Sequence, residues 1–253
     1  MKNTINVKSI RKQFSILNES NLIYFDNAST SLKPDIVIDK IKNYYSSYSA
    51  NVHRSIYKIG LKASEEYENV RQKVKDFINA KSIKNIIFTS GTTESINLIS
   101  HSWGLQNLKE NDEILLTEME HHSNIVPWQI CSQKTGCKIK YIPVNEVGEL
   151  DLSNINKLIN KKTKLVSLIH QSNVLGTINP INKIIQIAKK QGALTLIDAA
   201  QTVPHLKVDV EEIDCDFLVF SGHKMVGPTG VGILYGKEEI LNDMEPFMSG
   251  GQM

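Results

Sequence analysis

Short runs of apolar residues recur along this chain, and segments with helical patterns separate them. A strand that is apolar throughout must be covered on both faces, which is typical of parallel strands in an α/β sheet. Parallel strands need crossover connections, and helices supply them. The sequence therefore predicts an α/β fold with a mostly parallel sheet and helices on both faces. The expected strands lie at 86–88, 112–117, 138–143, 165–170, 194–198, 217–220 and 232–235, and the expected helices at 61–79, from 92 onward, 125–133, 152–160 and 181–191.

Composition excludes several classes of protein. The formal net charge of +2 over 253 residues gives no sign of a nucleic-acid or anionic-membrane partner. No apolar run reaches membrane-spanning length, and residues 1–20 lack the continuous hydrophobic region of a secretory signal. Three cysteines without paired spacing favour a reducing compartment and argue against a disulfide framework or a metal site. We therefore expect a cytoplasmic protein, in which residues 1–20 form an amphipathic helix or arm that packs on the body.

Two of the expected strands end in groups that can do chemistry. The strand at 194–198 ends in Asp198, and the strand at 217–220 is followed by Ser221, Gly222, His223 and Lys224. Ligands of α/β sheets bind at the carboxyl ends of strands, so both groups are expected to face one crevice. A lysine beside a cationic or polar group loses proton affinity and becomes a nucleophilic amine. Pyridoxal phosphate (PLP) chemistry uses both groups, the amine in a Schiff base and the carboxylate at the pyridine nitrogen. The alternative for Asp198 is a structural role as a helix cap or turn residue.

A third element fits a phosphate group. After the strand at 86–88, Gly91 precedes Thr92 and Thr93 at the start of an expected helix. The free N–H groups and the dipole of a helix N-terminus both favour an anion. The alternative is a plain capping box, in which Glu94 reaches back to the preceding backbone.

Taken together, these residues resemble the class V aminotransferase-like enzymes of fold type I, and among them the cysteine desulfurases of the Suf type, which are also described as selenocysteine-lyase-like. The most specific run is the paired histidine followed by Ser-Asn-Ile-Val-Pro-Trp. The stretches that carry the resemblance occur in the family's order over nearly the whole chain: YFDNA (24–28), ANVHR (50–54), GTTESINL (91–98), MEHHSNIVPW (119–128), SNVLG (172–176), DAAQ (198–201), SGHK (221–224) and GPTG (227–230).

The resemblance implies PLP as cofactor and assigns a role to each site residue. Lys224 would form the Schiff base, Asp198 would hold the ring nitrogen protonated, and His121 would stack on the ring and move protons. On general grounds His121 could instead be a loop histidine, Asn173 a turn former, and His53 with Arg54 a surface basic pair. The remaining implied roles are phosphate binding by Thr92, Thr93, Ser221 and His223, contact with the ring hydroxyl oxygen by Asn173 and Gln201, and substrate binding by His53, Arg54 and Asn173.

The resemblance also divides the chain into the arm at 1–20 and a PLP-binding large domain at 21–253. Members of the family continue with a C-terminal small domain of about 100 residues. That domain carries the nucleophilic cysteine in an Arg-x-Gly-x-x-Cys loop and the arginine that holds the substrate carboxylate. None of the three cysteines here lies in such a motif. The resemblance thus implies a piece of a longer chain or a truncated product, which would expose apolar surface and release no sulfur by itself.

The implied reaction converts L-cysteine to L-alanine and leaves a persulfide on an enzyme cysteine for iron–sulfur cluster assembly. L-Selenocysteine is an alternative substrate, and the implied partners are a sulfur-acceptor protein of the Suf system and a second copy of the chain in a homodimer. The paired histidine run and the His53–Arg54 loop favour this reaction over an aminotransferase, a kynureninase or an epimerase. A non-catalytic remnant that serves as a binding or dimerisation partner is the alternative from a different class.

Overall fold

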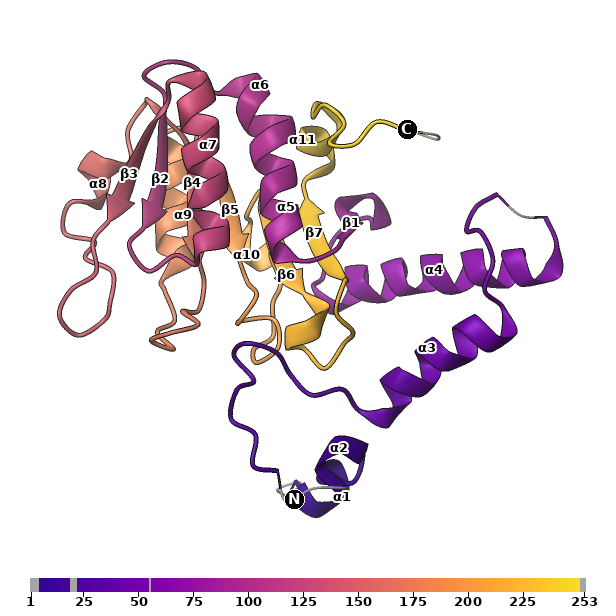
Figure 1. Ribbon diagram of the computed structural model, residues 1–253. Helices are drawn as coiled ribbons and strands as arrows, with labels where there is room; N and C mark the ends of the chain where they lie inside the picture. Colours follow the sequence, from indigo (N-terminus) through magenta and orange to yellow (C-terminus); the bar gives the residue numbers. More distant parts are fainter. Residues whose placement is uncertain (1–4, 19–21, 55, 251–253) are drawn as a thin grey trace.

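The computed structural model describes residues 5–18, 22–54 and 56–250, and they build a seven-stranded sheet (Figure 1). The strand order is β1-β7-β6-β5-β4-β2-β3, and β7 runs antiparallel to both of its neighbours while the other pairs are parallel. The predicted mostly parallel sheet is confirmed. The strands are β1 (Ile86–Thr89), β2 (Glu113–Thr117), β3 (Lys138–Ile142), β4 (Thr163–Ile169), β5 (Leu194–Asp198), β6 (Phe217–Ser221) and β7 (Gly232–Gly236).

Helices cover both faces of the sheet, as predicted (Figure 1). Successive side chains of a strand point to opposite faces, so each central strand contributes to two cores. In β6, for example, Phe217 and Val219 join one core, whereas Leu218 and Phe220 join the other. The first core lies under α5 (Thr92–Ile99), α6 (Leu105–Asn107), α7 (Val126–Thr135) and α11 (Glu238–Asn242), and the second under α8 (Ile155–Leu158), α9 (Ile181–Lys190) and α10 (Val210–Ile213).

Four helices near the N-terminus extend away from the sheet in Figure 1. The segment expected to form an amphipathic helix or arm contains two short helices, and residues 1–4 and 19–21 lie outside the described part of the chain. Phe14 and Leu17 are half-buried, whereas Ile5, Val7 and Ile10 are exposed, so only part of this arm packs. The four helices are α1 (Val7–Arg11), α2 (Ser15–Asn18), α3 (Asp35–Ser47) and α4 (Lys58–Phe77).

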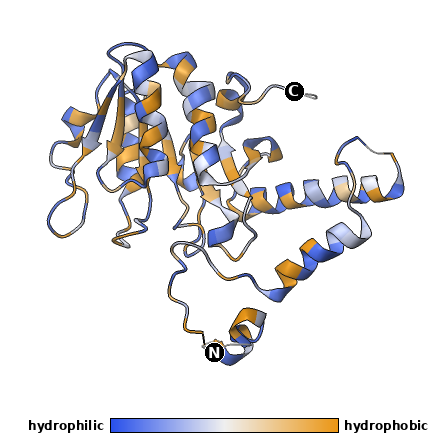
Figure 2. Cartoon of the chain, viewed as in Figure 1, coloured by the Kyte–Doolittle hydropathy of each residue, from blue (hydrophilic) through white to orange (hydrophobic). Residues whose placement is uncertain are grey.

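The interpretation of 61–79 as an ordinary packing helix is wrong for much of its length. Leu61 is 57% exposed, Val70 46% and Phe77 54%, although they lie on the predicted apolar face. Only the C-terminal part of α4 approaches the sheet, where Val74 packs against the core. Figure 2 shows hydrophobic residues along α3 and α4 beyond the sheet. Over the described ranges, none of the helices combines the length and the apolarity that crossing a membrane requires.

Candidate active site

A cavity of about 480 Å³ opens where β4, β5 and β6 end and α5 begins. This volume is in the range of small-molecule sites. All nine residues predicted to contact a cofactor line it: Thr92, Thr93, His121, Asn173, Asp198, Gln201, Ser221, His223 and Lys224. Six further lining residues had been assigned no role from the sequence, although four of them lie in the stretches that carry the resemblance: Asp26, Ala28, Ser123 and Ala200 in those stretches, and Ser29 and Ile169 outside them.

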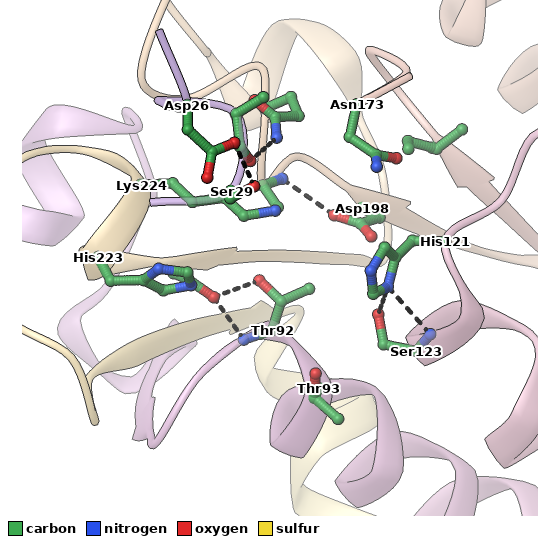
Figure 3. A pocket seen from close by; sticks show the side chains of 15 residues that line it. Asp26, Ser29, Thr92, Thr93, His121, Ser123, Asn173, Asp198, His223 and Lys224 are labelled. Atoms are coloured by element: carbon green, nitrogen blue, oxygen red, sulfur yellow. Dashed lines mark hydrogen bonds between the residues drawn. The ribbon is translucent and has the colours of Figure 1, made fainter. Parts of the chain in front are cut away.

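Asp198 and Lys224 approach the same space from neighbouring strands (Figure 3). Asp198 is 3% exposed, and its Oδ1 accepts the N–H of Ala200 at 2.9 Å. Burial raises the pKa of this carboxyl group, while the Ala200 N–H and the charges of Lys224 and His121 oppose the rise. Burial also lowers the pKa of the Lys224 ammonium, against the attraction of Asp198. The site therefore holds an amine that releases its proton more readily than an ordinary lysine.

His121 lies across the cavity from Lys224, at the turn after β2 (Figure 3). Its Nδ1 accepts the N–H of Ser123 at 3.1 Å and lies 2.7 Å from the Ser123 hydroxyl. Because Nδ1 is an acceptor, the proton of the neutral ring sits on Nε2. Burial and then the positive charge of Lys224 lower the pKa of His121, which favours the neutral ring. Ser123 thus sets the tautomer, and only the folded turn reveals its role.

The start of α5 has features of both a capping box and an anion-binding helix N-terminus. The Oε2 of Glu94 accepts the N–H of Ser90 at 2.7 Å, as the reaching-back half of a capping box would. The N–H of Thr92 donates to Ser221 Oγ at 2.8 Å, and the two hydroxyl oxygens lie 2.7 Å apart. The first N–H groups of a helix have no partner within the helix, so this terminus also remains suited to an anion.

A close approach of β7 to the turn before α5 explains why position 232 is glycine. A Cβ on Gly232 would lie 2.3 Å from the Cα of Gly91. Gly91 itself has φ 163°, an extended conformation open to any residue. The backbone at Gly91 therefore does not require glycine, whereas the close contact requires glycine at position 232.

The segment at 26–33 is held over the Lys224 turn, although the sequence offered no sign of this. The carbonyl of His223 accepts the N–H of Ser31 at 2.9 Å, its hydroxyl at 2.9 Å, and Lys33 Nζ at 2.9 Å. At the other end, Gln201 Nε2 donates to the carbonyl of Ala28 at 2.6 Å. These contacts immobilise the 3₁₀ turn Gly222–Lys224 and so define where Lys224 enters the cavity.

His53 and Arg54 do not line the cavity. The Nε2 of His53 lies 2.9 Å from Glu68 Oε1 on α4, and its backbone N–H donates to Ser64 Oγ at 2.8 Å. His53 also has a φ of 65°, in the left-handed region. A single copy of the chain does not bring this pair to the site, and their substrate role stays a prediction.

The three cysteines are buried and lie away from the cavity. Cys131 and Cys137 pack in the core under α7, and Cys215 packs in the opposite core. Burial raises the pKa of Cys215 to about 12, which keeps its thiol protonated. Among the described residues, no cluster of histidine, cysteine and carboxylate groups could hold a metal ion.

Comparison with known proteins agrees with this arrangement. A curated relative from Halalkalibacterium halodurans, named probable cysteine desulfurase, is 49% identical over an alignment of 253 positions, which covers 98% of this chain and 62% of the relative. A solved structure of cysteine desulfurase from Thermococcus onnurineus shares 42% sequence identity with this chain and superposes with a TM-score of 0.92. The match covers 99% of this chain and 62% of that one. The cysteine desulfurase CsdA of Escherichia coli is 38% identical with a TM-score of 0.91, over 99% and 63%.

The extent of these matches decides what they establish. The chain spans 62% and 59% of the length of two curated relatives that it matches. Within the chain the match is nearly complete, because the family model described as aminotransferase class V covers residues 23–253. With its sheet, its cavity and that match in agreement, the chain belongs to the class V aminotransferase family.

Proposed function

We propose that residues 21–253 form the PLP-binding domain of a cysteine desulfurase, with residues 1–20 as an N-terminal arm. The observation that carries this proposal is the convergence of Lys224, Asp198 and His121 with an anion-binding helix terminus on one cavity. The family is PLP-dependent, and curated relatives at 49% and 50% identity are named probable cysteine desulfurases. The substrate would be L-cysteine, with L-selenocysteine as the alternative.

The groups in the cavity suit PLP. They offer an amine for its aldehyde, a buried carboxylate for its pyridine nitrogen, an imidazole for its ring face, and hydroxyl and N–H donors for its phosphate. Asn173 and Gln201 would hold the ring hydroxyl oxygen, while Ser221 and His223 would join Thr92 and Thr93 at the phosphate. When bound, PLP supplies an electron sink for negative charge at the substrate α-carbon.

The protein's own groups would then divide the proton movements. Lys224 Nζ, deprotonated more readily because it is buried, would hold PLP through its aldehyde group and, when not bound to it, would take or return the α-proton. Asp198 stabilises a proton on the pyridine nitrogen. His121 carries its proton on Nε2, because Ser123 occupies Nδ1, and can deliver it near neutral pH.

Sulfur transfer needs a thiolate that none of the three cysteines supplies, because all are buried outside the cavity. We therefore assign the sulfur-accepting thiol to a residue other than Cys131, Cys137 and Cys215. In the complete reaction that thiol would become a persulfide and pass sulfur to a Suf-type acceptor protein for iron–sulfur assembly. A homodimer in the cytoplasm is the setting that we propose for it.

An assay with L-cysteine tests this function. We expect the 253-residue chain, loaded with PLP, to exchange the α-proton of L-cysteine with solvent deuterium while forming no alanine. NMR would follow the exchange, and an amino-acid assay would follow alanine. Alanine formation that disappears on Cys131→Ala, Cys137→Ala or Cys215→Ala would contradict the assignment of the thiol. Exchange with other amino acids but not with L-cysteine would favour an aminotransferase or a related enzyme instead.

Replacing Thr92 and Thr93 together with alanine tests the phosphate site. Hydrogen bonds to charged groups contribute about 1.5–3 kcal/mol each, so PLP affinity should fall at least about tenfold. The backbone N–H groups of α5 remain, so some binding should persist. Equilibrium titration of the protein with PLP measures the change. Thr135→Ala is the matched control, because its hydroxyl bonds to the Cys131 carbonyl and the Cys137 N–H, away from the cavity. An unaltered affinity would show that these threonines merely begin a helix.

A further inference from the structure

Glu120 is a buried carboxyl group that the proposed reaction does not use. It is 7% exposed, it does not line the cavity, and it directly precedes His121. Burying a carboxyl group is costly unless hydrogen bonds compensate. A group held at that cost beside a site calls for a structural or functional reason.

Both oxygens of Glu120 are fully engaged. Oε1 accepts the Thr117 hydroxyl at 2.7 Å and the N–H of Ile169 at 2.8 Å, and Oε2 accepts Asn124 Nδ2 at 2.7 Å. Asn124 cannot turn its amide around, because its Oδ1 already accepts Trp128 Nε1 at 3.0 Å and the Ser167 hydroxyl at 2.7 Å. The carboxyl group is therefore held from three directions by donors whose own positions are set.

These bonds join the two parts of the site. Thr117 ends β2, and Asn124 closes the turn that presents His121. Ile169 ends β4, lines the cavity and pairs in register with Asp198 on β5. By contrast, the side-chain hydrogen bonds of His121 itself are local, to Ser123. One carboxyl group thus connects the backbone that carries His121 to the strand end beside Asp198.

We propose that Glu120 is a positioning residue, whose carboxyl group sets the place of the His121 ring relative to Asp198 by binding Thr117, Asn124 and Ile169 at once. The inference rests on the proposed function of the cavity as a PLP site. It assigns Glu120 no contact with substrate or cofactor. Its effect passes through His121.

The electrostatics of the site are consistent with this role. Burial raises the pKa of Glu120 to about 8, and the negative charge of Asp198 on the neighbouring β5 adds to the rise, whereas the three donors oppose it. His121 is the titratable group that follows in the same turn. Glu120 therefore keeps a proton to higher pH than an ordinary glutamate, while its three donors hold the carboxyl group in place.

Glu120→Gln is the sharpest variant. The substitution keeps the size of the side chain but replaces an acceptor oxygen with an NH₂ group. That NH₂ group must face a donor, either Asn124 Nδ2 or the pair formed by the Thr117 hydroxyl and the Ile169 N–H. The turn should therefore shift. Because His121 would stack on the PLP ring and such ring pairs contribute about 0.5–1.5 kcal/mol, we expect PLP affinity to fall by up to about tenfold. The imidazole titration of His121, followed by NMR in the protein without cofactor and assigned with His121→Asn, should also shift.

Two further variants make the test specific. Glu113→Gln alters a carboxyl group that is also 7% exposed. Glu113 lies at the start of β2, the strand that ends three residues before Glu120, and it binds Asn160 and Lys140. The substitution should leave both the His121 titration and PLP affinity within about twofold of wild type. The double variant E120Q/N124D exchanges donor and acceptor across the bond, so it should recover most of both values.

The proposal is overturned if E120Q leaves the titration of His121 and the PLP affinity unchanged, or if E113Q changes them equally. Should E120Q not fold, E120Q/N124D decides. Wild-type values in that variant support the role, and a folded protein with a displaced His121 titration contradicts it. Failure of the wild-type protein to bind PLP would refute the proposed function instead, while the titration of His121 would still test Glu120.

Discussion

Lys224→Ala is expected to abolish covalent attachment of PLP to the protein, because among the described residues Lys224 is the one lysine that lines the cavity. Wild-type protein with PLP should absorb in the visible range, and borohydride reduction should leave the cofactor on the peptide that contains Lys224. The variant should lose both signals but keep noncovalent affinity through the phosphate site. Lys207→Ala, which removes an exposed lysine, is the control and should retain both. A reduced adduct on another lysine would refute the assignment.

The pH dependence of this attachment has a definite sign. Attachment needs the neutral amine, and burial lowers the pKa of Lys224 from its ordinary 10.5, while Asp198 opposes the shift. The covalent form should therefore appear at a lower pH than it does with a free lysine side chain. Asp198→Asn removes the opposing charge and should move the onset to still lower pH. A visible-absorbance titration of the two proteins measures both effects, and an onset as high as that of free lysine would contradict them.

Asp198→Asn should lower the rate of α-proton exchange of L-cysteine at least about a hundredfold, since one preorganised electrostatic group in a water-excluded site can account for 10²–10³ in rate. The substitution is chosen because the new side chain can still accept the Ala200 N–H, so the local turn is kept while the charge is lost. Deuterium exchange at the α-carbon, followed by NMR, measures the rate.

A matched control separates charge from folding in that experiment. Asp216 is also buried, and its Oδ2 accepts the Thr195 N–H at 2.8 Å at the far end of β5. Asp216→Asn should lower the thermal stability without changing the exchange rate. If Asp198→Asn left the rate unchanged, Asp198 would be only a structural cap.

Most of the sheet could be predicted because its strands are continuous apolar runs. Leu194–Asp198 matches its predicted range, and Thr163–Ile169 begins two residues earlier than expected, where lysines interrupt the pattern. The reversed direction of Gly232–Gly236 could not be predicted, because a strand's hydrophobicity says nothing about its direction. The exposure of α4 was equally hidden, since an apolar helical face does not reveal what covers it.

Some site residues could likewise be predicted from the sequence, and others could not. Asp198, Lys224, Thr92 and His121 could be singled out because reactive or anion-binding types follow apolar strands or begin a helix. Ser123 and the segment at 26–33 gave no such signal. The segment at 26–33 is important through hydrogen bonds to the His223 carbonyl that span more than 190 positions in the chain. Ser123 is important through a local contact with His121 Nδ1 that exists only once the turn has folded.

The sequence by itself determined how the seven strands follow one another along the chain and which reactive residues stand at the strand ends. Both depend on residues that are neighbours in the chain. Only the tertiary structure decided that Glu120 is buried and hydrogen-bonded on both oxygens, that Gly232 lets a strand approach Gly91, and that His53 turns to Glu68. Each of these depends on contacts between segments distant in sequence, and the energy of a buried polar group is set by the partners that folding brings to it.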